Sequence, residues 1–134
     1  PIMGPDSLLV PDFAEYLWES AGDGLYSMIA SAPDSELPPA GLEFLVDFKA
    51  RFQSSPNDYG IYGYEAASVV LNAIEQVCAP DRAAIVDAVM RTRNYAGVLG
   101  TWSLDENGDT SLVLVQAYQV NAYAWKPVPL PELP

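Results

Sequence analysis

The chain has 134 residues, half of them hydrophobic and only 18% charged, which is typical of a globular domain and not of a disordered segment. Its formal net charge of -12 excludes nucleic acid as a favoured partner, because an acidic surface repels phosphates. Histidine is absent, which excludes Ser-His-Asp catalysis, and a lone Cys78 excludes an intrachain disulfide and a cysteine-rich metal site. Cys78 is expected to be a small buried residue late in a helix.

The spacing of the apolar residues predicts alternating helices and extended segments. Helices are expected near 12–20, 41–53, 62–78 and 82–92. Extended segments are expected at 1–3, 24–30, 101–104, 111–120 and 123–127. The longest strand should lie within 111–120, where apolar and β-branched residues are most continuous. This alternation predicts an α/β fold with helices layered on sheets.

The ends of two of these helices carry recognisable signals. Asp12 and Glu15 have the spacing of a capping box at the start of the first helix. Asp81 is a good N-cap for the helix near 82–92, and Arg91 and Arg93 suit the negative end of its dipole. The helix at 62–78 is expected to be amphipathic. Its apolar face should hold Ala66, Val70, Ala73, Ile74 and Val77, and its polar face Glu65, Ser68, Asn72, Glu75 and Gln76.

The acidic sequence DENGD, residues 105–109, allows two interpretations. Asp105, Asn107 and Asp109 alternate as oxygen donors do in calcium loops. An EF-hand loop would also need a bidentate Glu at its twelfth position, where this chain has Gln116. A polar turn requires only that the carboxylates accept main-chain N–H bonds and that Gly108 adopts a positive φ. We therefore expect a turn without a bound metal.

Two longer stretches carry a resemblance to a known family. They are FLVDFKARFQSSPNDYGIYGYEAASVVLNAIEQV and NYAGVLGTWSLDENGDTSLVLVQAYQV. Together they resemble the C-terminal part of type I periplasmic solute-binding proteins, in particular the branched-chain amino acid (Leu/Ile/Val) components of ABC importers. The resemblance extends from Met3 to about Trp125. The element at 63–66 matches the family's Tyr-Asp-Ala motif, with Glu65 in place of the Asp. The second motif is matched by Gly97, Gly100, Asp105, Asn107, Gly108 and Asp109.

The resemblance implies two α/β lobes built on parallel sheets, joined by three crossings and closing around a ligand. Residues of about 1–33 and 110–126 would then belong to the second lobe, and about 40–105 to the first. Residues 127–134 form a proline-rich tail. The chain is expected to be a C-terminal fragment that lacks the opening strands of the first lobe and the export signal. Because uncovered sheet edges recruit partners, this fragment is expected to self-associate.

The implied function is capture of a small amino acid, most simply a branched-chain or aliphatic one, and its delivery to an ABC permease in the membrane. No catalytic residue, cofactor or metal is implied, and the location would be the periplasm or the cell surface. Asp6, after Gly-Pro, stands where the family carries the acid that pairs with the ligand's ammonium. A turn or N-cap role suits it equally well. Ser7 and Tyr62 are further candidates for ligand contact.

Aromatic residues near these candidates allow more than one interpretation. Tyr59, Tyr62 and Tyr64 gather at a helix start, where they can line a cleft or pack their rings and leave the hydroxyls in water. The three tryptophans are expected to be packing residues. They are Trp18, Trp102 and Trp125.

Three other functions stay open at this stage. A sensory or regulatory domain of the same fold would bind a similar solute but signal to a receptor or transcription partner. An acid–base hydrolase could use Asp105 and Asp109, although both lie in one short loop with no flanking aromatic platform. A purely structural interaction domain is the third.

Overall fold

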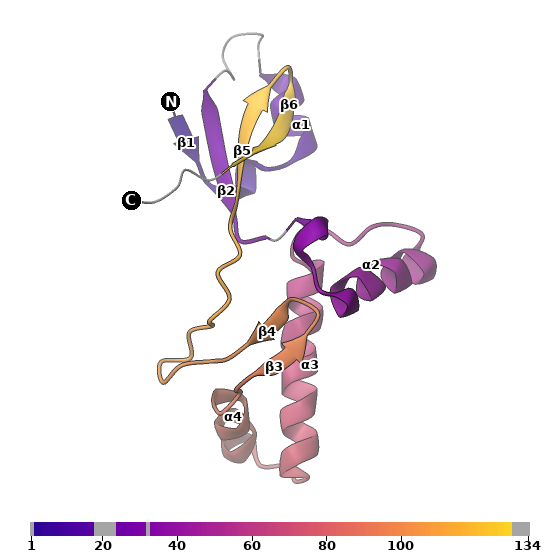
Figure 1. Cartoon of the computed structure of the whole chain (residues 1–134), viewed down its shortest axis with the longest axis vertical. Coiled ribbons are helices and arrows are strands. Elements are labelled where there is room, and N and C mark those ends of the chain that lie inside the picture. The colour runs from indigo at the N-terminus through magenta and orange to yellow at the C-terminus, as the bar shows by residue number, and fades with distance from the viewer. Residues whose placement is uncertain (1, 18–23, 32, 130–134) are drawn as a thin grey trace. The chain divides into compact units, whose positions relative to one another are not determined.

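The computed structural model describes residues 2–17, 24–31 and 33–129 (Figure 1). The chain divides into two compact units. We call the first the sheet unit, formed by Pro1–Ala32 with Leu114–Pro134, and the second the helical unit, formed by Pro33–Val113. Among the described helices, none combines the length and the apolar character needed to cross a membrane.

The sheet unit contains a four-stranded sheet in the order β1-β2-β5-β6. The strands are β1 (Ile2–Gly4), β2 (Leu25–Ile29), β5 (Gln116–Asn121) and β6 (Ala124–Val128). β1 and β2 run parallel, whereas β5 is antiparallel to both β2 and β6. The sheet is therefore mixed, where a parallel one was expected. The turn between β5 and β6 explains part of this, because a two-residue connection joins only antiparallel strands. Its residues Ala122 and Tyr123 have φ of 49° and 62°, as a type I′ turn requires.

One short helix covers the sheet near β6. This helix, α1 (Pro11–Tyr16), begins one residue earlier than predicted, and its N-cap is Val10 with no side-chain cap bond. The expected capping box of Asp12 and Glu15 is thus wrong, because proline at the first helical position fixes the start. The remainder of the predicted helix, with Trp18, lies outside the described residues. The buried residues of this unit are Ala14, Ser27, Ile29, Ala117 and Val120.

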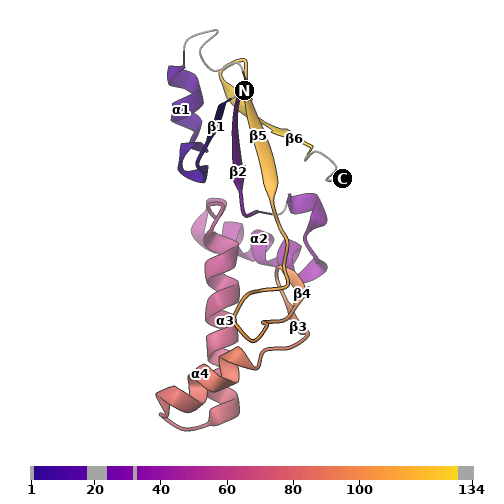
Figure 2. The same cartoon turned by 90° about the vertical axis from the view of Figure 1, so that its left-hand side faces the viewer.

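Besides one turn of 3-10 helix, η2 (Asp34–Glu36), the helical unit contains three α-helices and a hairpin. They are α2 (Pro39–Phe52), α3 (Gly60–Val77), α4 (Arg82–Met90), β3 (Tyr95–Gly97) and β4 (Gly100–Trp102). Figures 1 and 2 both show α4 packed near one end of α3, with the hairpin alongside the same helix. The N-cap expected at Asp81 is confirmed, whereas Arg91 and Arg93 follow the last turn of α4 and do not lie in it. The Asp81 carboxylate accepts a bond from the Ala84 N–H at 3.1 Å, and Arg93 donates to the carbonyls of Met90 and Thr92.

The buried face of α3 differs from the predicted one. Its buried residues are Ile61, Glu65, Val69 and Ala73, which follow one another every four positions. Val70 and Ile74, expected to be buried, are 44% and 42% exposed. Glu65, expected on the polar face, is only 3% exposed. The prediction failed because a glutamate with enough donors around it can take a core position.

The donors to Glu65 all come from the hairpin. Its carboxylate accepts bonds from the Val98 N–H at 2.9 Å, the Leu99 N–H at 3.5 Å and the indole N–H of Trp102 at 2.7 Å. A Cβ at Gly97 would collide with the same carboxylate, so the hairpin approaches this closely only because residue 97 is glycine. Glu65 thus fixes the hairpin on α3. Trp102, 8% exposed, is a packing residue as expected.

The strand predicted within 111–120 forms only in its second half. β5 begins at Gln116, and β2 and β6 pair with no residue before Gln116 and Ala117 respectively. Residues 111–115 lie at the boundary between the two units, so the β propensity of Leu112, Val113 and Val115 finds no partner strand in the part of the chain that is described. The last strand, β6, extends to Val128. The first two residues of the expected proline-rich tail, 127–134, therefore belong to the sheet.

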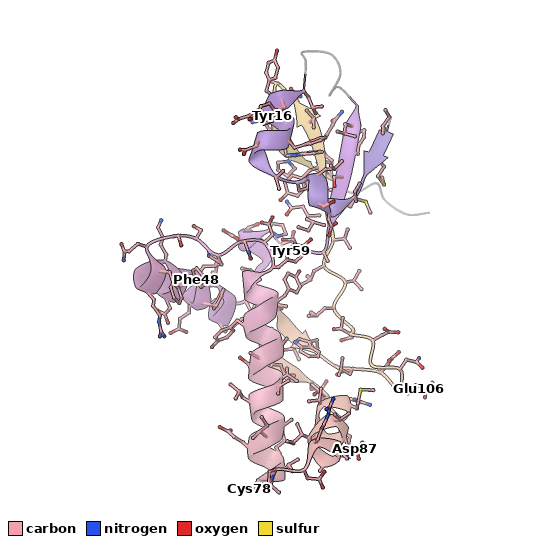
Figure 3. The ribbon with its side chains drawn as sticks, turned by 180° about the vertical axis from the view of Figure 1, so that it is seen from behind. Tyr16, Phe48, Tyr59, Cys78, Asp87 and Glu106 are labelled. Carbon is pink, nitrogen blue, oxygen red and sulfur yellow. The ribbon has the colours of Figure 1, made fainter. Side chains whose placement is uncertain are left out.

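Cys78 is exposed, contrary to expectation. It is the C-cap of α3 and adopts the left-handed conformation with φ 52°. Figure 3 shows it at the opposite end of α3 from Tyr59. A helix end at the surface leaves little apolar structure to cover the side chain.

Replacing Glu65 tests whether its carboxylate holds the helical unit together. We expect Glu65→Ala to lower the free energy of unfolding by about 3 kcal/mol, because buried N–H donors lose their acceptor. Glu65→Gln should cost less, because one acceptor oxygen is retained. Urea unfolding measures both. Glu75→Ala removes an exposed carboxylate from the same helix and should change stability by less than about 0.5 kcal/mol. Equal effects at the two positions would contradict the assigned role.

Candidate functional site

The sequence candidates Asp6 and Ser7 lie at the carboxyl end of β1, in a single turn of 3-10 helix, η1 (Asp6–Leu8). β1 and β2 are parallel, with Gly4 opposite Ser27, so their carboxyl ends reach the same edge of the sheet. In open α/β sheets this edge is where ligands bind. Both side chains are exposed, so the carboxylate of Asp6 and the hydroxyl of Ser7 are accessible at the strand edge.

The start of the turn that carries Asp6 is hydrogen-bonded to β2. Ser27 is fully buried, at 0% exposure, and its hydroxyl donates to the carbonyl of Pro5 at 2.9 Å. The same carbonyl accepts the Leu8 N–H at 3.1 Å. Both lone pairs of this oxygen are therefore engaged, which fixes the peptide plane between Pro5 and Asp6. Nothing in the local sequence around residues 4–8 indicated this long-range donor.

The other end of the turn is held by β6. The indole N–H of Trp125 donates to the carbonyl of Leu8 at 3.0 Å, and the Val10 N–H donates to the same oxygen at 2.8 Å. The Trp125 ring stacks on Phe13 of α1, with centroids 6.3 Å apart and planes inclined by 14°. Trp125 therefore packs, as expected, and also donates a hydrogen bond to the η1 turn.

The third candidate, Tyr62, lies in α3 of the helical unit, and Asp6 and Ser7 lie in the sheet unit. Its hydroxyl oxygen is buried and has no hydrogen-bond partner among the residues that the structure describes. Burial raises the pKa of this hydroxyl, so it stays neutral at physiological pH. The neighbouring Tyr64 packs on Phe44, with ring centroids 4.8 Å apart. The tyrosine cluster thus packs its rings, but the Tyr62 hydroxyl is not in water.

The acidic loop is a turn stabilised by its own first residue, and the main-chain part of the prediction is confirmed. The Asp105 carboxylate accepts the N–H groups of Asn107 at 2.8 Å and Asp109 at 2.9 Å. These N–H groups, that of Asp109 first, lower the pKa of Asp105. Gly108 has φ 88°, as a turn of this kind requires. Asp109 contributes its carbonyl, which accepts the Asp105 N–H. Glu106 lies at the tip (Figure 3). Within the described ranges, no three His, Cys, Asp or Glu residues gather as metal ligands.

With this geometry in hand, the chain was compared with known families. Residues 9–122 match the model of a family described as periplasmic binding protein. The chain belongs to the periplasmic binding protein family. The fold expected from the resemblance, type I periplasmic binding protein-like α/β, is thereby confirmed. The family members are periplasmic or extracellular solute-binding proteins and not enzymes.

Solved structures agree with this assignment. A leucine-binding protein, LivK, of Thermotoga maritima MSB8 is 27% identical, with a TM-score of 0.74, over 96% of this chain and 36% of that one. LivJ of Streptococcus pneumoniae, solved with isoleucine, is 21% identical, with a TM-score of 0.70, over 96% and 37%.

A solute-binding protein of R. palustris in complex with benzoate is more distant. It is 16% identical, with a TM-score of 0.60, over 81% of this chain and 30% of that one. This periplasmic binding protein chain thus spans about a third of the length of each of these relatives. No curated protein gave a significant match.

The Asp105 turn makes a pH-dependent contribution to stability that can be measured. Because the pKa is lowered on folding, the ionised carboxylate stabilises the folded state above the ordinary aspartate pKa. This contribution is lost as the pH falls through the lowered pKa. Urea unfolding of the protein and of Asp105→Ala should show a difference in stability that is constant near neutral pH and disappears in acid. Glu106→Ala, an exposed change in the same loop, should show no such trend. A difference independent of pH would contradict the assignment.

Proposed function

We propose that the complete protein is the extracytoplasmic solute-binding component of an ABC importer, and that its ligand is a small amino acid with a branched or aliphatic side chain. The observation that supports this most directly is the exposed Asp6 carboxylate on a turn whose two ends are held by β2 and β6. A carboxylate held in place makes a strong charge-assisted hydrogen bond to an ammonium group. It also loses little conformational entropy when the ligand binds.

The charge of Asp6 bears on the class of ligand. A solute with a carboxylate and no ammonium, such as the benzoate in the R. palustris relative, would be repelled by Asp6. A zwitterionic amino acid presents an ammonium to Asp6, and its own carboxylate then requires donors from elsewhere. Leucine and isoleucine, named for two of the similar structures, have this chemistry.

The two compact units support a closing mechanism. We assign the sheet unit to one lobe of the binding protein and the helical unit to the other, with the boundaries near residues 32–33 and 113–114. A ligand held between lobes is enclosed by a hinge motion, and no bond of the ligand is made or broken. The closed protein, in the periplasm or at the cell surface, then delivers the solute to a membrane permease. Ser7 and Tyr62 would contribute to the ligand contacts.

The amino acid specificity can be tested by calorimetry on the complete protein with leucine, isoleucine, valine, amides and urea. We expect binding of at least one branched-chain amino acid, and a loss of about 2–4 kcal/mol in Asp6→Ala, because the desolvated ammonium loses its charged partner. Asp12→Ala removes an exposed carboxylate from the same unit and should leave the affinity within about twofold. No heat with any amino acid would contradict the function. An unchanged Asp6→Ala affinity would remove Asp6 from the site.

The 134-residue chain by itself should bind leucine weakly or not at all. One exposed ion pair contributes at most about 1 kcal/mol, whereas micromolar binding needs about 8 kcal/mol. We also expect the chain to self-associate through apolar surface on α2 and α3. Val46 and Leu71 are 67% and 60% exposed there. Phe44, Phe48 and Phe52 of α2, with Tyr64 of α3, line a groove of about 660 Å³.

Light scattering and leucine titration of the isolated chain test these two expectations. Val46→Lys with Leu71→Lys should reduce the association, whereas Ala50→Lys with Ala67→Lys, at exposed positions of the same helices that do not line the groove, should not. A monomer at high concentration, or micromolar leucine binding by the chain alone, would show that the lobes divide differently from the assignment above.

A further inference from the structure

We infer that Ser27 and Trp125 are positioning residues for Asp6, setting the direction of its carboxylate toward the ligand's ammonium through the main chain of the η1 turn. The inference rests on the proposed function, in which Asp6 binds the ammonium, and it identifies what gives that carboxylate its geometry. Neither side chain is expected to touch the ligand.

The turn cannot hold this geometry by its own bonds. η1 has three residues, and its main-chain bonds are those from the Leu8 N–H to Pro5 and from the Leu9 N–H to Asp6, at 3.1 and 2.8 Å. A single turn fixes many dihedral angles for few bonds and is unfavourable in isolation. Its N-cap, Pro5, provides no side-chain cap bond. The conformation therefore depends on groups outside residues 5–9.

Two such groups are present, one on each side of Asp6. Ser27 donates to the carbonyl that precedes Asp6 and Trp125 to the carbonyl of Leu8, two residues after Asp6. The two donors come from different strands of one sheet and are 22 and 117 residues away from their acceptors in sequence. Because a carbonyl is held on each side of Asp6, the main chain at this residue has little freedom. The direction of the Cα–Cβ bond of Asp6 is therefore fixed as well.

The donors themselves are held firmly. Ser27 has no exposed surface, because it lies in β2 between β1 and β5, opposite Gly4 and Tyr118. Trp125 is fixed in β6 opposite Val120, which is 4% exposed, and its ring stacks on Phe13. A side chain that binds a ligand gains from such support, because errors of about 1 Å in position remove much of an interaction.

Trp125→Phe and Ser27→Ala separate this role from a general effect on stability. Trp125→Phe retains an aromatic ring against Phe13 and removes only the N–H donor. Trp102→Phe is the matched control, because it likewise removes an indole N–H bond. That bond lies in the helical unit and is buried, whereas the Trp125 bond is partly buried. All variants are made in the complete protein, and a cooperative urea transition confirms that each is folded.

The first measurement is hydrogen exchange of the Leu8 and Leu9 amides. Exchange should be about tenfold faster in Trp125→Phe and Ser27→Ala and unchanged in Trp102→Phe. Unchanged exchange in the first two variants would overturn the inference, whatever ligand the protein binds.

The second measurement is the leucine Kd, with Asp6 present and in an Asp6→Ala background. If Trp125 acts through Asp6, Trp125→Phe should raise the Kd about tenfold in the first case and less than twofold in the second. An equal change in both backgrounds would show a general structural role and overturn the inference. A protein that binds no amino acid would overturn the proposed function instead, and the exchange rates would still decide whether Ser27 and Trp125 hold the turn.

Discussion

The helical unit is organised around a buried carboxylate whose donors, in the part of the chain that the structure describes, are uncharged N–H groups. Glu65 takes its hydrogen bonds from two main-chain N–H groups and one indole of the β3–β4 hairpin. In a region of low dielectric constant such bonds are strong, and an unmatched charge would be very costly. The carboxylate therefore tolerates few arrangements of the hairpin. It orients the segment around Val98 and Leu99, both of which are buried, against α3.

The sheet unit also holds a loop by long-range hydrogen bonds, but with the roles of side chain and main chain exchanged. There the side chains donate and the main chain accepts, since Ser27 and Trp125 both bind carbonyl oxygens of the η1 turn. In each unit a loop with few local bonds is held by side chains from regular elements that lie far away in sequence. A loop fixed in this way can present a functional group at the surface and stay ordered.

The features that sequence predicted correctly depend on near neighbours. Asp81 caps a helix that begins at the next residue, and the Asp105 turn closes within four residues. The motif resemblance added the family and the fold, which no local rule supplies. It also placed Glu65 at a motif position, but amphipathic spacing assigned that residue to the solvent. The donors that allow its burial come from 33 to 37 residues later in the chain. Ser27 went unnoticed for the same reason, while the roles of Asp6, Ser7 and Tyr62 stay predictions.

The order of the two units along the chain bears on how the protein folds. The helical unit is one continuous segment, inserted between β2 and β5 of the sheet unit. During synthesis it can form its contacts once residues 33–113 have emerged, because all of them lie within one continuous segment. The sheet unit can be completed only after residues 116–125 have been synthesised, because Ile29 pairs with Gln116 and the Leu8 carbonyl accepts its hydrogen bond from Trp125. The turn that carries Asp6 precedes the helical unit along the chain, and its bond from Trp125 can form only after that unit has been synthesised. Without β6 this turn lacks one of the two long-range hydrogen bonds that shape it.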